Sequence, residues 1–90
     1  MATAYEVAFK YEILNEVIAS VDGLIGREFP KKLPSDIAPL SDEVWDIYHK
    51  IQLERDIDVL EQYDKRLLEI RDYVQNSADK SKKSKKRMVG

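Results

Sequence analysis

The chain has 90 residues, enough for one small domain with a marginal core, because a chain of this size buries only about 60% of its unfolded surface. It has no Cys, which excludes disulfides and thiolate zinc sites, and its single His excludes a His-rich metal site. The net charge of −2 is unevenly divided: residues 1–78 carry 9 Lys and Arg against 16 Asp and Glu, a charge of −7, whereas residues 79–90 carry 6 against 1, a charge of +5.

The first residues contain charges that a secretory signal does not tolerate. Glu6, Lys10 and Glu12 interrupt the apolar stretch that such a signal needs, and no apolar run approaches membrane-spanning length. We therefore expect a soluble, cytoplasmic protein that does not enter a membrane.

A first helix is predicted over residues 4–25. Thr3 and Glu6 have the spacing of a capping box, and Gly26 followed by Pro30 indicates the end. Apolar residues recur at the helical spacing of one buried face: Val7, Tyr11, Leu14, Val17, Ile18, Val21, Leu24 and Ile25.

Residues 27–40 form a connection that contains all three prolines and is longer than usual between packed helices. Apolar residues occur in it every three or four positions, at Phe29, Leu33, Ile37 and Leu40. We expect an ordered loop that lies against the helices.

A second helix is predicted from Ser41, a good N-cap, to about residue 76, because neither Gly nor Pro appears before Asn76 and Ser77. Its apolar residues form two seams that face nearly opposite ways. The first seam contains Val44, Ile47, Tyr48 and Ile51. The second seam has coiled-coil spacing and contains Leu53, Ile57, Leu60, Tyr63, Leu67, Ile70 and Val74.

These elements predict an all-α fold, with residues 1–76 as one helical domain. In one arrangement, a helical hairpin with a long second helix (about 41–76) self-associates through the second seam into a helical bundle, as a homodimer. In the alternative arrangement the second helix breaks near residues 52–56, which gives a three-helix bundle.

Three further groups of residues are candidates for binding. Glu54, Asp58, Glu61, Glu69 and Asp72 share one sector of the second helix and form either a solvated face or an acidic surface for a basic partner. Trp45 lies off the first seam and is either an anchor for a partner or a side chain packed on the long loop. Residues 77–90 are predicted to be a disordered tail, with the basic residues Lys80, Lys82, Lys83, Lys85, Lys86 and Arg87.

No catalytic site, metal site or cofactor is predicted. Asp46 and His49 have the i, i+3 spacing of helical di-metal sites, but those sites use Glu where this chain has Asp. There is no Gly-rich phosphate loop and no strand-turn-helix elbow.

The sequence therefore predicts a non-enzymatic helical module that acts by occupying the surface of another protein. Two alternatives remain open at this point. One is a nucleic-acid-associated adaptor that uses the basic tail without sequence preference, and the other is a small acidic inhibitor or immunity-type protein of a basic partner.

Overall fold

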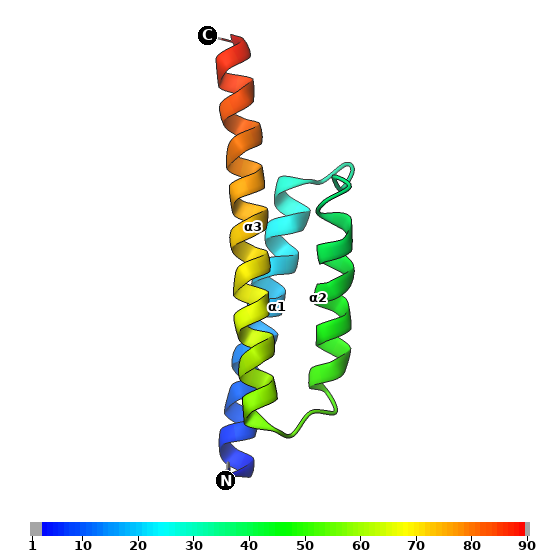
Figure 1. Cartoon of the computed structure of the whole chain (residues 1–90), viewed down its shortest axis with the longest axis vertical. Coiled ribbons are helices and arrows are strands. Elements are labelled where there is room, and N and C mark those ends of the chain that lie inside the picture. Colours follow the sequence, from blue (N-terminus) through cyan, green and yellow to red (C-terminus); the bar gives the residue numbers. More distant parts are fainter. Residues whose placement is uncertain (1–2, 90) are drawn as a thin grey trace.

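Three helices make up the described part of the chain. The computed structural model describes the backbone of residues 3–89 and the side chains of residues 3–80. The helices are α1 (Ala4–Glu28), α2 (Ala38–Ile51) and α3 (Ile57–Val89), and residues 3–89 contain no strand. Helices α1 and α3 start at the same end of the molecule and α2 runs in the opposite direction (Figure 1). The prediction of an all-α bundle is confirmed, and the number of helices matches the three-helix alternative.

Thr3 starts α1 as predicted, because its Oγ1 atom accepts a hydrogen bond of 3.1 Å from the backbone N–H of Glu6. The predicted end at Gly26 is wrong, since α1 continues to Glu28 and neither described glycine has a positive φ. Pro30 explains the observed end. A residue before proline is driven out of the helical region, and Phe29 has φ −130° and ψ 63°.

Helix α2 begins three residues before the predicted cap at Ser41. A turn precedes it, in which the N–H groups of Ile37 and Ala38 both donate to the carbonyl of Pro34 at 3.0 Å. Pro39 occupies the first turn of α2, where its missing N–H would have no helical partner in any case. The loop before α2 is packed rather than loose, because Phe29 and Leu33 contact the core.

The long second helix predicted over residues 41–76 is wrong, because the chain leaves the helical path between Ile51 and Ile57. Two acidic side chains stabilise this break. The Glu54 carboxylate accepts hydrogen bonds from the backbone N–H groups of Arg55 (3.1 Å) and Asp56 (3.0 Å). Asp56 is the N-cap of α3, and its Oδ1 atom accepts the N–H of Asp58 at 2.9 Å. The helix therefore ends and restarts without Gly or Pro.

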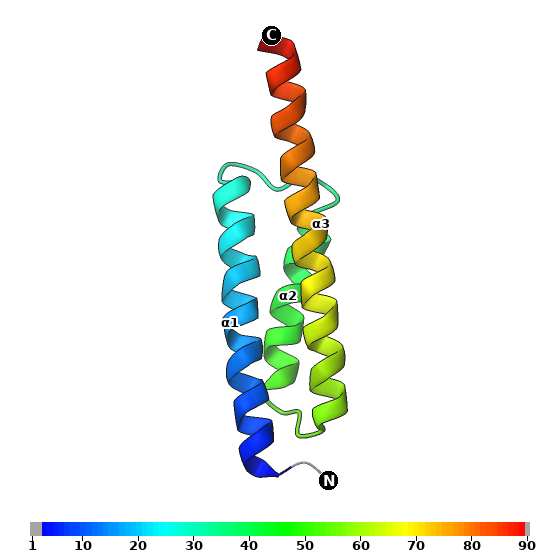
Figure 2. The ribbon, with the colours of Figure 1, turned by 90° about the vertical axis from the view of Figure 1, so that its left-hand side faces the viewer.

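Helix α3 passes through Asn76 and Ser77, where the sequence predicts its end and the start of a disordered tail, and continues to Val89. Ala78, which lies beyond residue 76, is also buried. The C-terminal part of α3 extends beyond the ends of the other helices (Figure 2). The basic side chains after Lys80 lie outside the described residues, and nothing tests the predicted role of the tail.

One apolar core holds the helices together, and it contains no buried polar side chain within the described residues. Helix α3 packs mainly against α1, whereas α2 makes smaller contacts with both. None of the helices in residues 3–89 combines the length and the apolar composition needed to cross a membrane. The buried residues of the cluster are Leu14, Ile18, Val21, Leu24, Ile25, Ile37, Val44, Ile47, Ile51, Leu60, Leu67, Ile70 and Val74.

Candidate protein-interaction surface

The second seam, predicted to bind a partner, forms part of the core of its own chain. Leu60, Leu67, Ile70 and Val74 are fully buried, and Ile57 and Tyr63 are half-buried. Leu53 is separated from the seam, because it lies in the break and is 86% exposed. The break at residues 52–56 allows α3 to fold back beside α1, so α1 covers the face that the continuous helix would have offered to another copy. The seam is therefore corrected from an interface to a core.

The first two turns of α1 expose large aromatic side chains instead. Tyr5 is 84% exposed and Phe9 is 61% exposed. Together with Ile13 they lie four residues apart along one side of the helix. Beside this side lies a shallow hollow of about 470 Å³, lined by Tyr5, Glu6, Phe9, Lys10, Ile13 and Ile57.

This aromatic surface was not among the predicted site residues. A signal for it exists in the sequence, because residues 4–9 are apolar at every position except Glu6. A helical segment that is apolar on most sides is normally largely buried, but only Val7 of this segment is even half-buried in the structure. A second hollow, of about 380 Å³, lies on the other side of the segment and is lined by Ala4, Val7, Ala8 and Tyr11 together with residues of the break.

A third hollow lies along the boundary of α1 and α3, next to the aromatic one. It has a volume of about 480 Å³, and its lining includes Lys10, Asp58, Glu61, Lys65 and Leu68. Lys10 lines both this hollow and the aromatic one. Its Nζ atom lies 3.2 Å from Oδ2 of Asp64, an ion pair that ties α1 to α3 at the floor of this boundary.

The predicted acidic face is divided by the break. Asp58, Glu61, Glu69 and Asp72 are exposed on α3 and keep the predicted arrangement. Glu54 lies in the break, where its carboxylate binds backbone N–H groups and is half-buried. The acidic surface that α3 presents therefore starts at Asp58.

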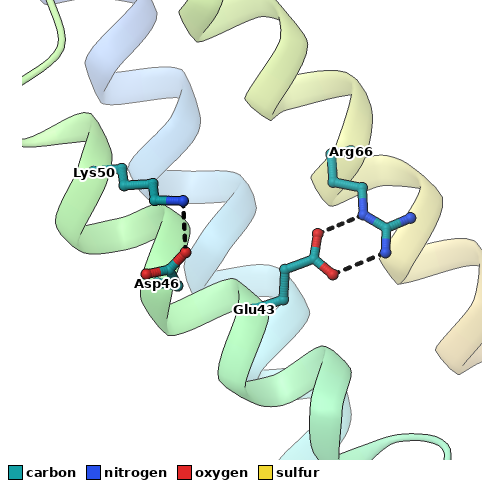
Figure 3. Close-up of polar contacts among 4 residues, drawn as sticks. All are labelled: Glu43, Asp46, Lys50 and Arg66. Atoms are coloured by element: carbon teal, nitrogen blue, oxygen red, sulfur yellow. Dashed lines mark hydrogen bonds and ion pairs between the residues drawn. The ribbon is translucent and has the colours of Figure 1, made fainter.

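Ion pairs on the other side of the bundle fix α2 (Figure 3). The Arg66 guanidinium donates two hydrogen bonds to the Glu43 carboxylate, at 2.5 and 2.8 Å, and so joins α3 to α2. This hydrogen bonding lowers the pKa of the Glu43 carboxyl below its usual value. Within α2, the hydrogen bond from Lys50 to Asp46 at 2.9 Å raises the pKa of Lys50.

Trp45 is 45% exposed on α2, and its ring meets that of Tyr48 edge to face at a centroid distance of 5.7 Å. Its role as an anchor stays a prediction. His49 is exposed beside the same Tyr48 ring. Residues 3–80 contain no group of three or more metal-ligating side chains.

Comparison of the chain with models of known protein families, with curated proteins and with solved structures finds no match.

Proposed function

We propose that this protein is a non-enzymatic interaction module that binds another protein through the aromatic end of α1. The observation that carries the proposal is the exposure of Tyr5 and Phe9 in a helical segment, residues 4–9, that is apolar at every position except Glu6. Exposed apolar surface that is contiguous on a small protein is typical of an interaction site. Aromatic side chains are also enriched at the energetic centres of protein interfaces.

The homodimer predicted from the sequence depends on the second seam, and α1 already covers that seam. We therefore propose that the partner is a different protein. The charge of the surrounding surface favours a basic partner, because the exposed Asp58 and Glu61 line the hollow that adjoins the apolar one, and Glu69 and Asp72 are exposed further along α3. This agrees with the predicted alternative of a small acidic protein that acts on a basic partner.

A photo-crosslinking amino acid at position 9 tests the proposal in cells that produce the protein. A discrete crosslinked species that contains a second protein is the expected result. The same amino acid at Asp42, an exposed position on α2, is the control and should give no such species. If position 9 gives no discrete product, or gives the same products as position 42, the aromatic end of α1 is not an interaction site.

A further inference from the structure

The two neighbouring hollows that share Lys10 form one groove along the boundary of α1 and α3. Tyr5, Phe9 and Ile13 line it from α1, and Ile57 and Leu68 line it from α3. These two helices lie side by side in both views of the bundle (Figure 1, Figure 2). Ile57 and Leu68 are 11 positions apart on α3, about 16 Å at 1.5 Å per helical residue. The apolar lining is concentrated at one end, around Tyr5, Phe9, Ile13 and Ile57, and Leu68 is the one apolar residue that lines the other hollow.

The rims of this groove are acidic. Glu6, Asp58 and Glu61 line it, whereas the Lys10 ammonium is already paired with Asp64. On α1, Glu12 and Glu16 follow Phe9 and Ile13 by three residues, which places them on the adjoining surface of the helix. Both are exposed, and neither forms an ion pair within the described residues.

Lys65 is the one cation lining the groove in residues 3–80 that has no carboxylate partner within salt-bridge distance. The groove therefore combines an apolar floor at the end formed by Tyr5, Phe9, Ile13 and Ile57 with an excess of free negative charge on both sides.

We propose that this groove binds an amphipathic helix of the partner protein, with an apolar stripe flanked by Lys and Arg. The inference rests on the proposed function and adds the chemistry of the bound segment. An amphipathic helix places its apolar residues into such a groove at positions i, i+4, i+7 and i+11. About three turns of partner helix span the distance from Ile57 to Leu68, and its basic flanks face the carboxylates of both rims.

A second copy of this chain is a poorer occupant, because pairing the groove with itself brings the acidic rims of two molecules together. The basic segment 79–90 of another copy is also poorer. It supplies positive charge, but its apolar residues are only Met88 and Val89, and so it lacks the stripe that the floor requires.

Three synthetic helical peptides of about 16 residues test the proposal by fluorescence anisotropy. The first has the apolar stripe with Lys on its flanks, the second has the same stripe with Glu on its flanks, and the third has the composition of the first in scrambled order. We expect the first peptide to bind at least tenfold more tightly than the other two. Its affinity should also fall as salt is raised, because the rim charges are exposed.

Four variants locate the binding. Phe9→Ser removes the exposed aromatic from the groove and should weaken binding of the first peptide about tenfold or more. Glu61→Lys reverses one rim charge and should weaken it several-fold at low salt. Leu53→Ser and Asp42→Lys are the matched controls, since both residues are exposed and line neither hollow, and they should leave the affinity unchanged.

Three outcomes would overturn the inference. Equal binding of the Lys-flanked and Glu-flanked peptides, still sensitive to Phe9→Ser, would leave an apolar interaction site without the proposed basic partner. Absence of binding by all three peptides would reject the helix-in-groove mode, while the crosslink at position 9 would decide the proposed function separately. A dimer of the full chain that Phe9→Ser dissociates would identify a second copy as the occupant.

Discussion

Replacing Leu67 by alanine tests whether the apolar seam of α3 belongs to the core of its own chain. Leu67 has no exposed surface, and removal of a buried leucine side chain costs about 2–5 kcal/mol through lost burial and the cavity left behind. A domain of 90 residues has a total unfolding free energy of about 5–13 kcal/mol. We expect Leu67→Ala to lower that free energy by about 3 kcal/mol, a large part of the whole.

Leu68 supplies a matched control at the next position of the same helix. It is 42% exposed, so Leu68→Ala changes helix propensity in the same way but removes much less buried surface. We expect a loss of about 1 kcal/mol or less for this variant.

Urea unfolding followed by circular dichroism at 222 nm measures both effects. Each protein is unfolded at two concentrations about a hundredfold apart, because the stability of an obligate dimer depends on concentration whereas that of a monomer does not. We expect midpoints that are independent of concentration. A midpoint that rises with concentration for the unaltered protein but not for Leu67→Ala, or equal losses for Leu67→Ala and Leu68→Ala, would refute the placement of the seam in the core.

Three further changes have expected effects on unfolding free energy, each measured by the same urea titration. Thr3→Ala removes the cap of α1 and should cost about 1 kcal/mol, whereas a change under 0.3 kcal/mol would contradict a stabilising cap. Gly26→Ala should add about 0.5–1 kcal/mol, because Gly26 lies inside α1 with helical backbone and an added methyl group meets, outside its chain neighbours and the backbone of its own helix, no atom within 4 Å. Arg66→Gln should cost about 0.5 kcal/mol at pH 7, since both partners of the Glu43 pair are about a third or more exposed. Because the pKa of Glu43 is lowered in the folded state, the stabilisation from the Glu43–Arg66 pair is present above pH 4.5 and is lost as pH falls below that value. The unaltered protein should therefore lose more stability than Arg66→Gln between pH 7 and pH 3, and equal losses would contradict a stabilising pair.

The helical periodicity of the sequence predicts most of the buried residues, although Leu53 of the second seam is exposed. Leu14, Ile18 and Val21 of the first stripe are buried in α1, and the first seam of the second predicted helix is buried in α2 except for the half-buried Tyr48. Both seams enter the same core, although they would face opposite ways if residues 41–76 formed one continuous helix. The reversal of the chain at residues 52–56 turns the second seam toward α1.

The sequence predicts a break near residues 52–56 only as an alternative to a continuous helix, because neither Gly nor Pro marks it and the chain uses carboxylates in their place. Asp56 was available as a signal, since aspartate is among the best N-caps and Asp58 adds negative charge in the first turn. The exposed aromatic surface of α1 was not predicted, for a related reason. The second seam of the predicted long helix has no place in a two-helix core, and so the sequence predicts that this seam binds a partner. The apolar first turns of α1, with Tyr5 and Phe9, fit the start of a core helix and give no separate prediction of a binding surface.

The absolute mass in solution, measured by light scattering during gel filtration, tests most directly the claim that α1 covers the seam of α3 within one chain. We expect the unaltered protein to have the 10.5 kDa mass of one chain at every loading concentration. We also expect Leu60→Lys, which places a charge at a fully buried position, to unfold it. A dimer that Leu60→Lys converts into a monomer with unchanged helix content would contradict the account, because it would show that the seam is an interface between two copies.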